Sequence, residues 1–194
     1  MYEYHVFISY QRSSPTVPVW VRNHFYPRLR ELMDDLVDYD VKIFLDDQVP
    51  VGGEWPELAR EALRRARILI PVCSPKYFND EWCMAEWRSM EKREALVGTG
   101  TREWPGRLIY PVIFSDSKNF PEFAHQRRMR SLKTWNLPYP HYQNTAEYID
   151  FHREMERVVE ELVEIISQVP EWCSEWPVEE AAPVLPKPSK LPRF

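Results

Sequence analysis

Short apolar segments alternate with amphipathic ones over most of the chain, and this alternation limits the possible folds more than any other feature. The apolar segments at residues 4–9, 41–45, 68–73 and 108–114 are rich in β-branched and aromatic residues and have the length of buried strands. Apolar residues recur at spacings of three and four over residues 17–38, 55–66, 79–97 and 146–169, which predicts helices. Strands that alternate with helices predict an α/β fold with a parallel sheet covered on both faces.

Three parts of this pattern are less regular. Pro27 falls inside the first helix and predicts a kink there. Pro111 falls inside the segment 108–114, so we expect a bulge or an edge position for that strand. A short helix over 121–130 and a weak fifth strand within 131–137 complete the prediction.

The composition changes after Val169. Six prolines follow within the last 25 residues, at positions 170, 177, 183, 186, 188 and 192. We therefore divide the chain into a domain over residues 1–169 and an extended, proline-rich tail over 170–194. Trp172 and Trp176 are expected to fold back onto the domain.

Composition also narrows the classes of function. The formal net charge of -5 disfavours binding to nucleic acid. Three cysteines form no metal-binding or redox spacing, and the five histidines form no metal spacing, so we predict reduced thiols and no metal. No apolar run reaches the length of a membrane span, and the N-terminus does not resemble a signal peptide. We expect a soluble cytoplasmic protein that binds neither nucleic acid nor membrane.

Residues 74–90 are the strongest candidate for a functional site. This stretch leaves the third predicted strand through Ser74 and enters a helix, for which Asn79 is a plausible N-cap and Phe78 a hydrophobic staple. Trp82 and Glu86 are four residues apart and therefore share one face of the helix. A carboxylate beside a large aromatic ring, at the carboxyl edge of a parallel sheet, is well placed to meet a ligand.

The loops after the first two strands are expected at the same edge of the sheet. The first loop carries Tyr10, Gln11 and Arg12. The second begins at Asp46, contains two adjacent glycines and ends at Trp55. A dehydrogenase is disfavoured because no Gly-x-Gly-x-x-Gly motif follows the first strand. A response-regulator receiver is disfavoured because that strand ends in Ser9 and Tyr10, where the class needs metal-binding acids.

Together these motifs resemble Toll/interleukin receptor (TIR) domains. Residues 6–10, Val-Phe-Ile-Ser-Tyr, are similar to the opening motif of the family, and residues 44–46 with the glycine-containing loop resemble its BB loop. Ser74-Pro75 followed by Trp82, Cys83 and Glu86 resembles its third-strand and third-helix signature. The resemblance covers residues 4–168. It implies a flavodoxin-like fold with a central parallel sheet of about five strands.

The family contains adaptors that only assemble and enzymes that cleave NAD+. The resemblance is to a stand-alone, bacterial-type NAD+-cleaving member, in which Glu86 matches the catalytic glutamate. By the same resemblance Tyr10, Gln11, Arg12, Asp46, Trp55, Ser74 and Trp82 are candidate substrate contacts. NAD+ is then the substrate, and no cofactor is expected. The products would be nicotinamide and ADP-ribose or a cyclic ADP-ribose isomer, in antiphage or immune defence signalling.

The chemistry of NAD+ explains how one carboxylate can be enough. Glycoside hydrolysis normally needs two carboxyl groups, because the leaving alkoxide must be protonated. Nicotinamide is a cationic pyridinium in NAD+ and leaves as a neutral base, so no general acid is needed. An ionised glutamate can stabilise the ribosyl oxocarbenium ion that remains.

Structural interpretations of the same residues stay open. Glu86 can be a solvated helix residue, Trp82 a core residue, Asp46 a turn former and Arg12 a solvated cation. Trp55 can simply cover a helix start, and Cys83 reads best as a buried structural thiol. The chain can then be a non-enzymatic adaptor that acts by homotypic TIR–TIR assembly, or an enzyme that resembles nucleoside deoxyribosyltransferases. If it is a TIR enzyme, we expect activity in a homo-oligomer and a separate sensor or effector protein.

Overall fold

The computed structural model describes residues 1–45, 55–98 and 107–181, with the side chains of Trp55 and Pro56 excepted. Its centre is a parallel sheet in the order β2-β1-β3-β4-β5. The strands are β1 Tyr4–Tyr10, β2 Ile43–Phe44, β3 Ala66–Cys73, β4 Val112–Ile113 and β5 Arg130–Ser131. This order is that of flavodoxin-like folds, so the predicted fold class is confirmed.

β1 and β3 are the longest strands and form the middle of the sheet. They pair from Tyr4 opposite Ala66 to Tyr10 opposite Val72. Their alternate side chains enter two different core layers: Val6, Ile8 and Tyr10 lie on one face of the sheet and Phe7 on the other. The strands therefore need apolar residues at nearly every position, which is why they appear as continuous apolar runs.

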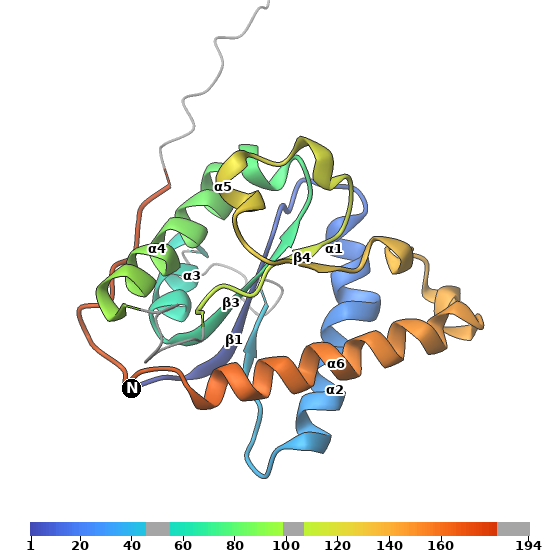
Figure 1. Ribbon diagram of the computed structural model, residues 1–194, viewed down its shortest axis with the longest axis horizontal. Helices are drawn as coiled ribbons and strands as arrows, with labels where there is room; N and C mark the ends of the chain where they lie inside the picture. The colour runs from blue at the N-terminus through green and yellow to red at the C-terminus, as the bar shows by residue number, and fades with distance from the viewer. Residues whose placement is uncertain (46–54, 99–106, 182–194) are drawn as a thin grey trace, which may run out of the picture.

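Helices cover both faces of the sheet (Figure 1). One face is covered by α1 Val17–Trp20, the π-helical η1 Val21–Phe25, α2 Tyr26–Leu36 and the long α6 Glu147–Ser167. The other face is covered by α3 Trp55–Arg64, the 3-10 helix η3 Tyr77–Asn79, α4 Glu81–Val97 and α5 Glu122–His125. The shorter 3-10 turns are η4 Ser117–Asn119, η5 Lys133–Trp135 and η6 Pro140–Asn144.

Pro27 lies at the start of α2, directly after the π-helical turn. A proline has no N–H to donate, and the wider turn before it accommodates that loss. The predicted helix over 17–38 therefore consists of three consecutive helical segments, α1, η1 and α2.

Pro111 interrupts the fourth strand. Ile109 forms an isolated bridge with Leu69 of β3. Regular pairing of the fourth strand with β3 begins only after the proline, at Val112 and Ile113. The predicted strand over 108–114 is thus too long. An edge position is also wrong, because β4 lies between β3 and β5, and the carbonyl of Pro111 accepts a hydrogen bond from Arg130.

The bounds predicted for the short helix and the fifth strand between residues 121 and 137 are wrong as well, whereas those of the last helix agree with α6 to within two residues. α5 ends at His125 rather than at 130, and β5 occupies Arg130–Ser131 instead of lying within 131–137. Arg130 pairs opposite Val112, and residues 133–135 form the turn η5. A two-residue strand is too short for an alternating pattern to reveal it.

Residues 170–181, hereafter the C-terminal segment, contain no helix or strand and run along α3 and α4. The indole N–H of Trp172 donates to the carbonyl of Arg64 over 3.3 Å. Trp176 is buried, with its ring 5.1 Å from the guanidinium carbon of Arg93. The prediction that both tryptophans fold back onto the domain is confirmed.

Candidate active site

Glu86 lies in the second turn of α4, against the carboxyl end of β1, at the point where the strand order reverses. Its exposed fraction is only 8%. A carboxylate buried this deeply is uncommon unless it is paired or hydrogen-bonded. The interpretation of Glu86 as a solvated helix residue is therefore wrong.

Two groups from β1 and its loop face the Glu86 carboxylate. The Ser9 hydroxyl donates a hydrogen bond of 2.5 Å to Oε2, and an Arg12 guanidinium nitrogen lies 4.0 Å from Oε1. Ser9 in turn lies 2.9 Å from the phenol oxygen of Tyr77. Both groups on the carboxylate favour its ionised form, the hydroxyl by donating and the guanidinium by its charge.

Tyr77 is fully buried at the start of η3, and its phenol oxygen is also 3.3 Å from the carbonyl of Cys83. Burial is the main cause that raises the pKa values of Tyr77 and of the Cys83 thiol well above their ordinary values. Both groups therefore stay neutral at physiological pH. This agrees with the interpretation of Cys83 as a structural thiol.

The start of α4 differs from the prediction. Asp80 is the N-cap, with its Oδ1 accepting from the backbone N–H groups of Trp82 and Cys83 over 3.0 and 3.1 Å. Asn79 instead ends η3, and its side chain donates to the carbonyl of Pro75. Asp80 suits the N-cap position because its carboxylate also interacts favourably with the positive end of the helix dipole.

The structure places the predicted residues unequally around Glu86. Arg12 and Trp82 lie beside it, whereas Ser74 lies at the buried end of β3. Gln11 is buried and donates to the Ser13 hydroxyl over 2.6 Å.

The Tyr10 ring belongs to the core on the opposite face of the sheet, so we leave Tyr10 out of the proposed substrate contacts. Asp46 and the side chain of Trp55 lie outside the described residues. The roles predicted for them stay predictions.

Ser9 and Tyr77 are site residues that sequence reasoning missed. A signal for Ser9 was present, because it is a polar residue near the carboxyl end of a mostly apolar strand, and alternation places it on the same face as Phe7. No comparable signal existed for Tyr77, whose neighbours suggest only a turn.

The space beside Glu86 is small. Trp82 and Ala85 of α4 enclose it with Leu63 of α3 and with Val178 and Glu179 of the C-terminal segment. The cavity volume is about 10 Å³, which is room for about one water molecule. A dinucleotide can therefore enter on this side only if these elements move apart.

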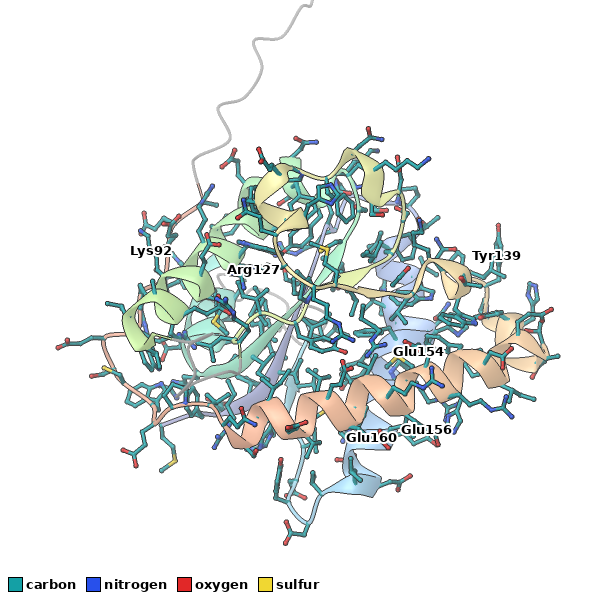
Figure 2. The ribbon with its side chains drawn as sticks, in the orientation of Figure 1. Lys92, Arg127, Tyr139, Glu154, Glu156 and Glu160 are labelled. Atoms are coloured by element: carbon teal, nitrogen blue, oxygen red, sulfur yellow. The ribbon has the colours of Figure 1, made fainter. Side chains whose placement is uncertain are left out.

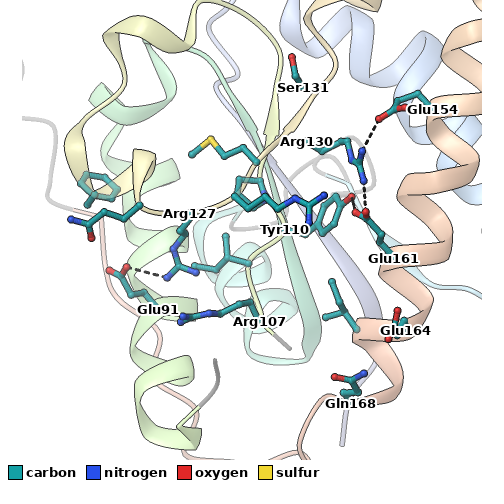
Figure 3. Close-up of a pocket in the computed structure, with 17 residues that line it drawn as sticks. Glu91, Arg107, Tyr110, Arg127, Arg130, Ser131, Glu154, Glu161, Glu164 and Gln168 are labelled. Atoms are coloured by element: carbon teal, nitrogen blue, oxygen red, sulfur yellow. Dashed lines mark hydrogen bonds and ion pairs between the residues drawn. The ribbon is translucent and has the colours of Figure 1, made fainter. Parts of the chain in front are cut away.

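A much larger cavity, of about 910 Å³, lies elsewhere, between α4, α6 and the strands β4 and β5 (Figure 3). Two of the arginines that line it are in ion pairs: Arg127 with Glu91 and Glu94, and Arg130 with Glu154 and Glu161. Glu86 is not among the residues that line it. We interpret this ion-pair network as structural and place the candidate site at Glu86.

The described part of the chain contains no group of three or more His, Cys, Asp or Glu side chains that could hold a metal ion. None of its helices is both long and apolar enough to cross a membrane.

Comparison with known proteins agrees with this architecture. The family model of the TIR domain matches residues 6–163. The TIR domain of the Toll-related receptor TRR-2 from Hydra magnipapillata has a similar structure, with a TM-score of 0.50 and 16% identity over 79% of this chain and 98% of that one. The TIR domains of the activated Roq1 resistosome, which recognises the pathogen effector XopQ, match with a TM-score of 0.40 and 16% identity over 86% of this chain and 97% of theirs.

The order of the sheet and the position of Glu86 define the class of protein. It is a flavodoxin-like α/β protein with a buried carboxylate at its topological switch point. Because the family model covers most of the sequence, the chain belongs to the TIR-domain family. The structural likeness at this low identity supports the fold alone.

Proposed function

We propose that this protein is an NAD+ glycohydrolase or ADP-ribosyl cyclase that cleaves the bond between nicotinamide and ribose, with Glu86 as the catalytic residue. The single observation that carries the proposal is the buried Glu86 carboxylate at the switch point of the sheet, with a hydroxyl donor on one oxygen and a cation near the other. Following the family resemblance, we place the activity in nucleotide-based cell defence.

The carboxylate acts on charge that develops as the bond breaks. The electrons of the glycosidic bond leave with nicotinamide, which becomes neutral, and a positive charge appears on the ribose ring. A fixed negative charge in a partly dry site stabilises that ion more strongly than water does. Water then adds to the ribose carbon and gives ADP-ribose, or a nucleophile of the same substrate adds and gives a cyclic isomer.

Arg12 and Trp82 complete the proposed site. The side chain of Arg12 is 36% exposed and its guanidinium lies 4.0 Å from the Glu86 carboxylate, so we propose that it meets the diphosphate of the substrate beside the glutamate. The Trp82 indole lies on the same helix face as Glu86 and offers a surface on which a flat ring can stack.

The adaptor function is the second candidate, and one observation favours it. The cavity beside Glu86 is far too small for NAD+ while Val178 and Glu179 lie over it. In an adaptor this space never opens, and the buried Glu86 serves only the packing of α4 on β1. Homotypic assembly belongs to both functions, since TIR enzymes usually complete their sites across subunits.

Product analysis separates the candidates. Purified protein is incubated with NAD+, and the mixture is resolved by chromatography and mass spectrometry. We expect nicotinamide together with ADP-ribose or a cyclic isomer, and loss of both products in Glu86→Ala but not in the control Glu91→Ala, whose side chain is on the outer part of α4. No cleavage at any protein concentration would favour the adaptor, and base exchange between nucleosides would favour a deoxyribosyltransferase.

A further inference from the structure

The hydroxyls around Glu86 form a chain that comes from three different elements. Tyr77 of η3 contacts Ser9 of β1 over 2.9 Å, and Ser9 contacts Glu86 of α4 over 2.5 Å. Ser9 and Tyr77 are each at most 1% exposed, so bulk solvent does not compete for either hydroxyl. These hydrogen bonds therefore fix where the carboxylate lies relative to the sheet edge.

The number of hydroxyl protons determines which group donates in each of these hydrogen bonds. Each hydroxyl has one proton to donate. When Glu86 is ionised, Ser9 donates to the carboxylate and Tyr77 can donate to Ser9 over 2.9 Å, which is closer than the carbonyl of Cys83 at 3.3 Å. When Glu86 is protonated, the chain can reverse: the carboxyl donates to Ser9, Ser9 to Tyr77, and Tyr77 to the carbonyl of Cys83 at 3.3 Å. Neither state leaves a buried hydroxyl proton without an acceptor.

The charge near the other oxygen favours the ionised state. Arg12 lies 4.0 Å from Oε1 and favours the carboxylate. In the described part of the chain, the titratable and charged groups around Glu86 are Arg12 after β1, Tyr77 of η3, Cys83 of α4, Arg60 of α3 and Glu179 of the C-terminal segment. Tyr77 and Cys83 are kept neutral by burial.

We propose that Ser9 and Tyr77 are positioning residues, which hold the ionised Glu86 carboxylate at the edge of the sheet through the hydrogen bonds Tyr77–Ser9–Glu86. Tyr77 acts only through Ser9, because its phenol reaches Glu86 by no other hydrogen bond among the described residues. This role rests on the proposed function of Glu86. The hydrogen-bond chain itself is testable without it.

The test uses single and double variants of the full chain. Ser9→Ala and Tyr77→Phe each remove one hydroxyl. Tyr142→Phe is the control, because it removes a phenol hydroxyl from an equally buried site on the other face of the sheet that does not contact Glu86. Two readouts are compared: the titration midpoint of the Glu86 carboxyl, by carbon-13 NMR of glutamate-labelled protein, and the pH profile of kcat for nicotinamide release.

For Ser9→Ala we expect the midpoint of Glu86 to rise by about one pH unit, because the ionised form loses a donor. We expect kcat to fall by roughly 10- to 100-fold, the worth of a hydrogen bond to a charged group, with a smaller change in KM. Tyr77→Phe should shift both readouts in the same direction by less. The double variant should match Ser9→Ala alone, since Tyr77 acts through Ser9.

Three outcomes would overturn the proposal. One is a Glu86 midpoint that Ser9→Ala leaves unchanged. Another is a double variant in which the two effects add, as they would for independent packing roles. The third is an equal shift in the control variant Tyr142→Phe. If the wild-type protein releases no nicotinamide, the proposed function fails. The NMR titration midpoints of the variants still decide whether the hydrogen bonds Tyr77–Ser9–Glu86 hold the carboxylate.

Discussion

At the scale of single residues, contacts within one helix could be predicted from the sequence, whereas contacts between different elements could not. Trp82 and Glu86 could be placed on one helix face from their spacing, and both line the same small cavity. The partner of Glu86 could not be predicted, because Ser9 is 77 residues away in sequence. Spacing along a helix reveals local neighbours, whereas a hydrogen bond between elements requires their packing.

The N-cap of α4 gives a prediction at this scale. Asp80→Ala removes the acceptor for two backbone N–H groups and should lower the free energy of unfolding by about 1 kcal/mol. Asn79→Ala is the matched control and should cost less, because its side chain bonds only a carbonyl at an exposed position. Urea unfolding measures both. Equal losses in the two variants would argue against Asp80 as the cap.

At the scale of elements, a buried cation joins α3, β3 and α4. The Arg93 guanidinium donates to the carbonyls of Ala66 and Leu63, over 2.8 and 3.2 Å, near the end of α3. Burial lowers the pKa of Arg93 to about 10, which leaves it protonated at neutral pH. A cation at the negative end of a helix is favourable, and here it also provides donors for carbonyls that the helix leaves unpaired.

Arg93→Met should therefore lower the free energy of unfolding by about 1–3 kcal/mol, since it leaves buried carbonyls without a donor. The control is Arg153→Met on α6, where the exposed ion pair with Asp150 contributes little. Denaturant unfolding of the two variants is the measurement. A loss for Arg93→Met no larger than that of the control would contradict this role.

The attachment of the C-terminal segment should depend on pH. Glu179 accepts from Lys92 over 2.6 Å and from Arg88 over 2.8 Å, and its backbone N–H donates to Ser89; Figure 2 shows Lys92 on α4. The bond from Lys92 is the largest cause that lowers the pKa of Glu179 below its ordinary value of 4.5. A lowered carboxyl pKa means that the stabilisation is present above 4.5 and is lost as the pH falls through the lowered value.

The amide signal of Glu179 in NMR spectra should accordingly stay constant from pH 7 to pH 5 and move at lower pH toward the position of a released segment. Glu179→Gln should show the released position already at pH 7. A segment that stays attached until the whole domain unfolds in acid would show that these ion pairs do not hold it.

At the scale of the whole molecule, the parallel sheet and its flavodoxin-like class could be predicted, whereas the strand bounds at its far edge could not. Three loops were expected at one edge, and the structure brings the first loop and α4 together there through Arg12 and Glu86. The prediction failed at β4 and β5, where two-residue strands depend on pairing across the sheet rather than on their own sequence. The attachment of Val178 and Glu179 beside Glu86 was also beyond prediction, because an extended segment carries no periodicity.

Assembly gives the prediction at this scale. If subunits complete one another's sites, the rate of nicotinamide release should rise more steeply than the first power of protein concentration. Sedimentation over the same concentrations should show oligomers forming in parallel. A rate strictly proportional to protein concentration would contradict assembly-dependent activity while leaving cleavage by the monomer intact.

The most direct test of the central claim is the rate of nicotinamide release from NAD+ by wild-type protein and by Glu86→Gln, at equal concentration and with equal thermal stability. Glutamine keeps the size of the side chain and removes its charge, so the comparison isolates the carboxylate. Loss of about 4 kcal/mol of transition-state stabilisation predicts a rate about a thousandfold lower. A Glu86→Gln variant that cleaves NAD+ within tenfold of the wild-type rate would contradict the account.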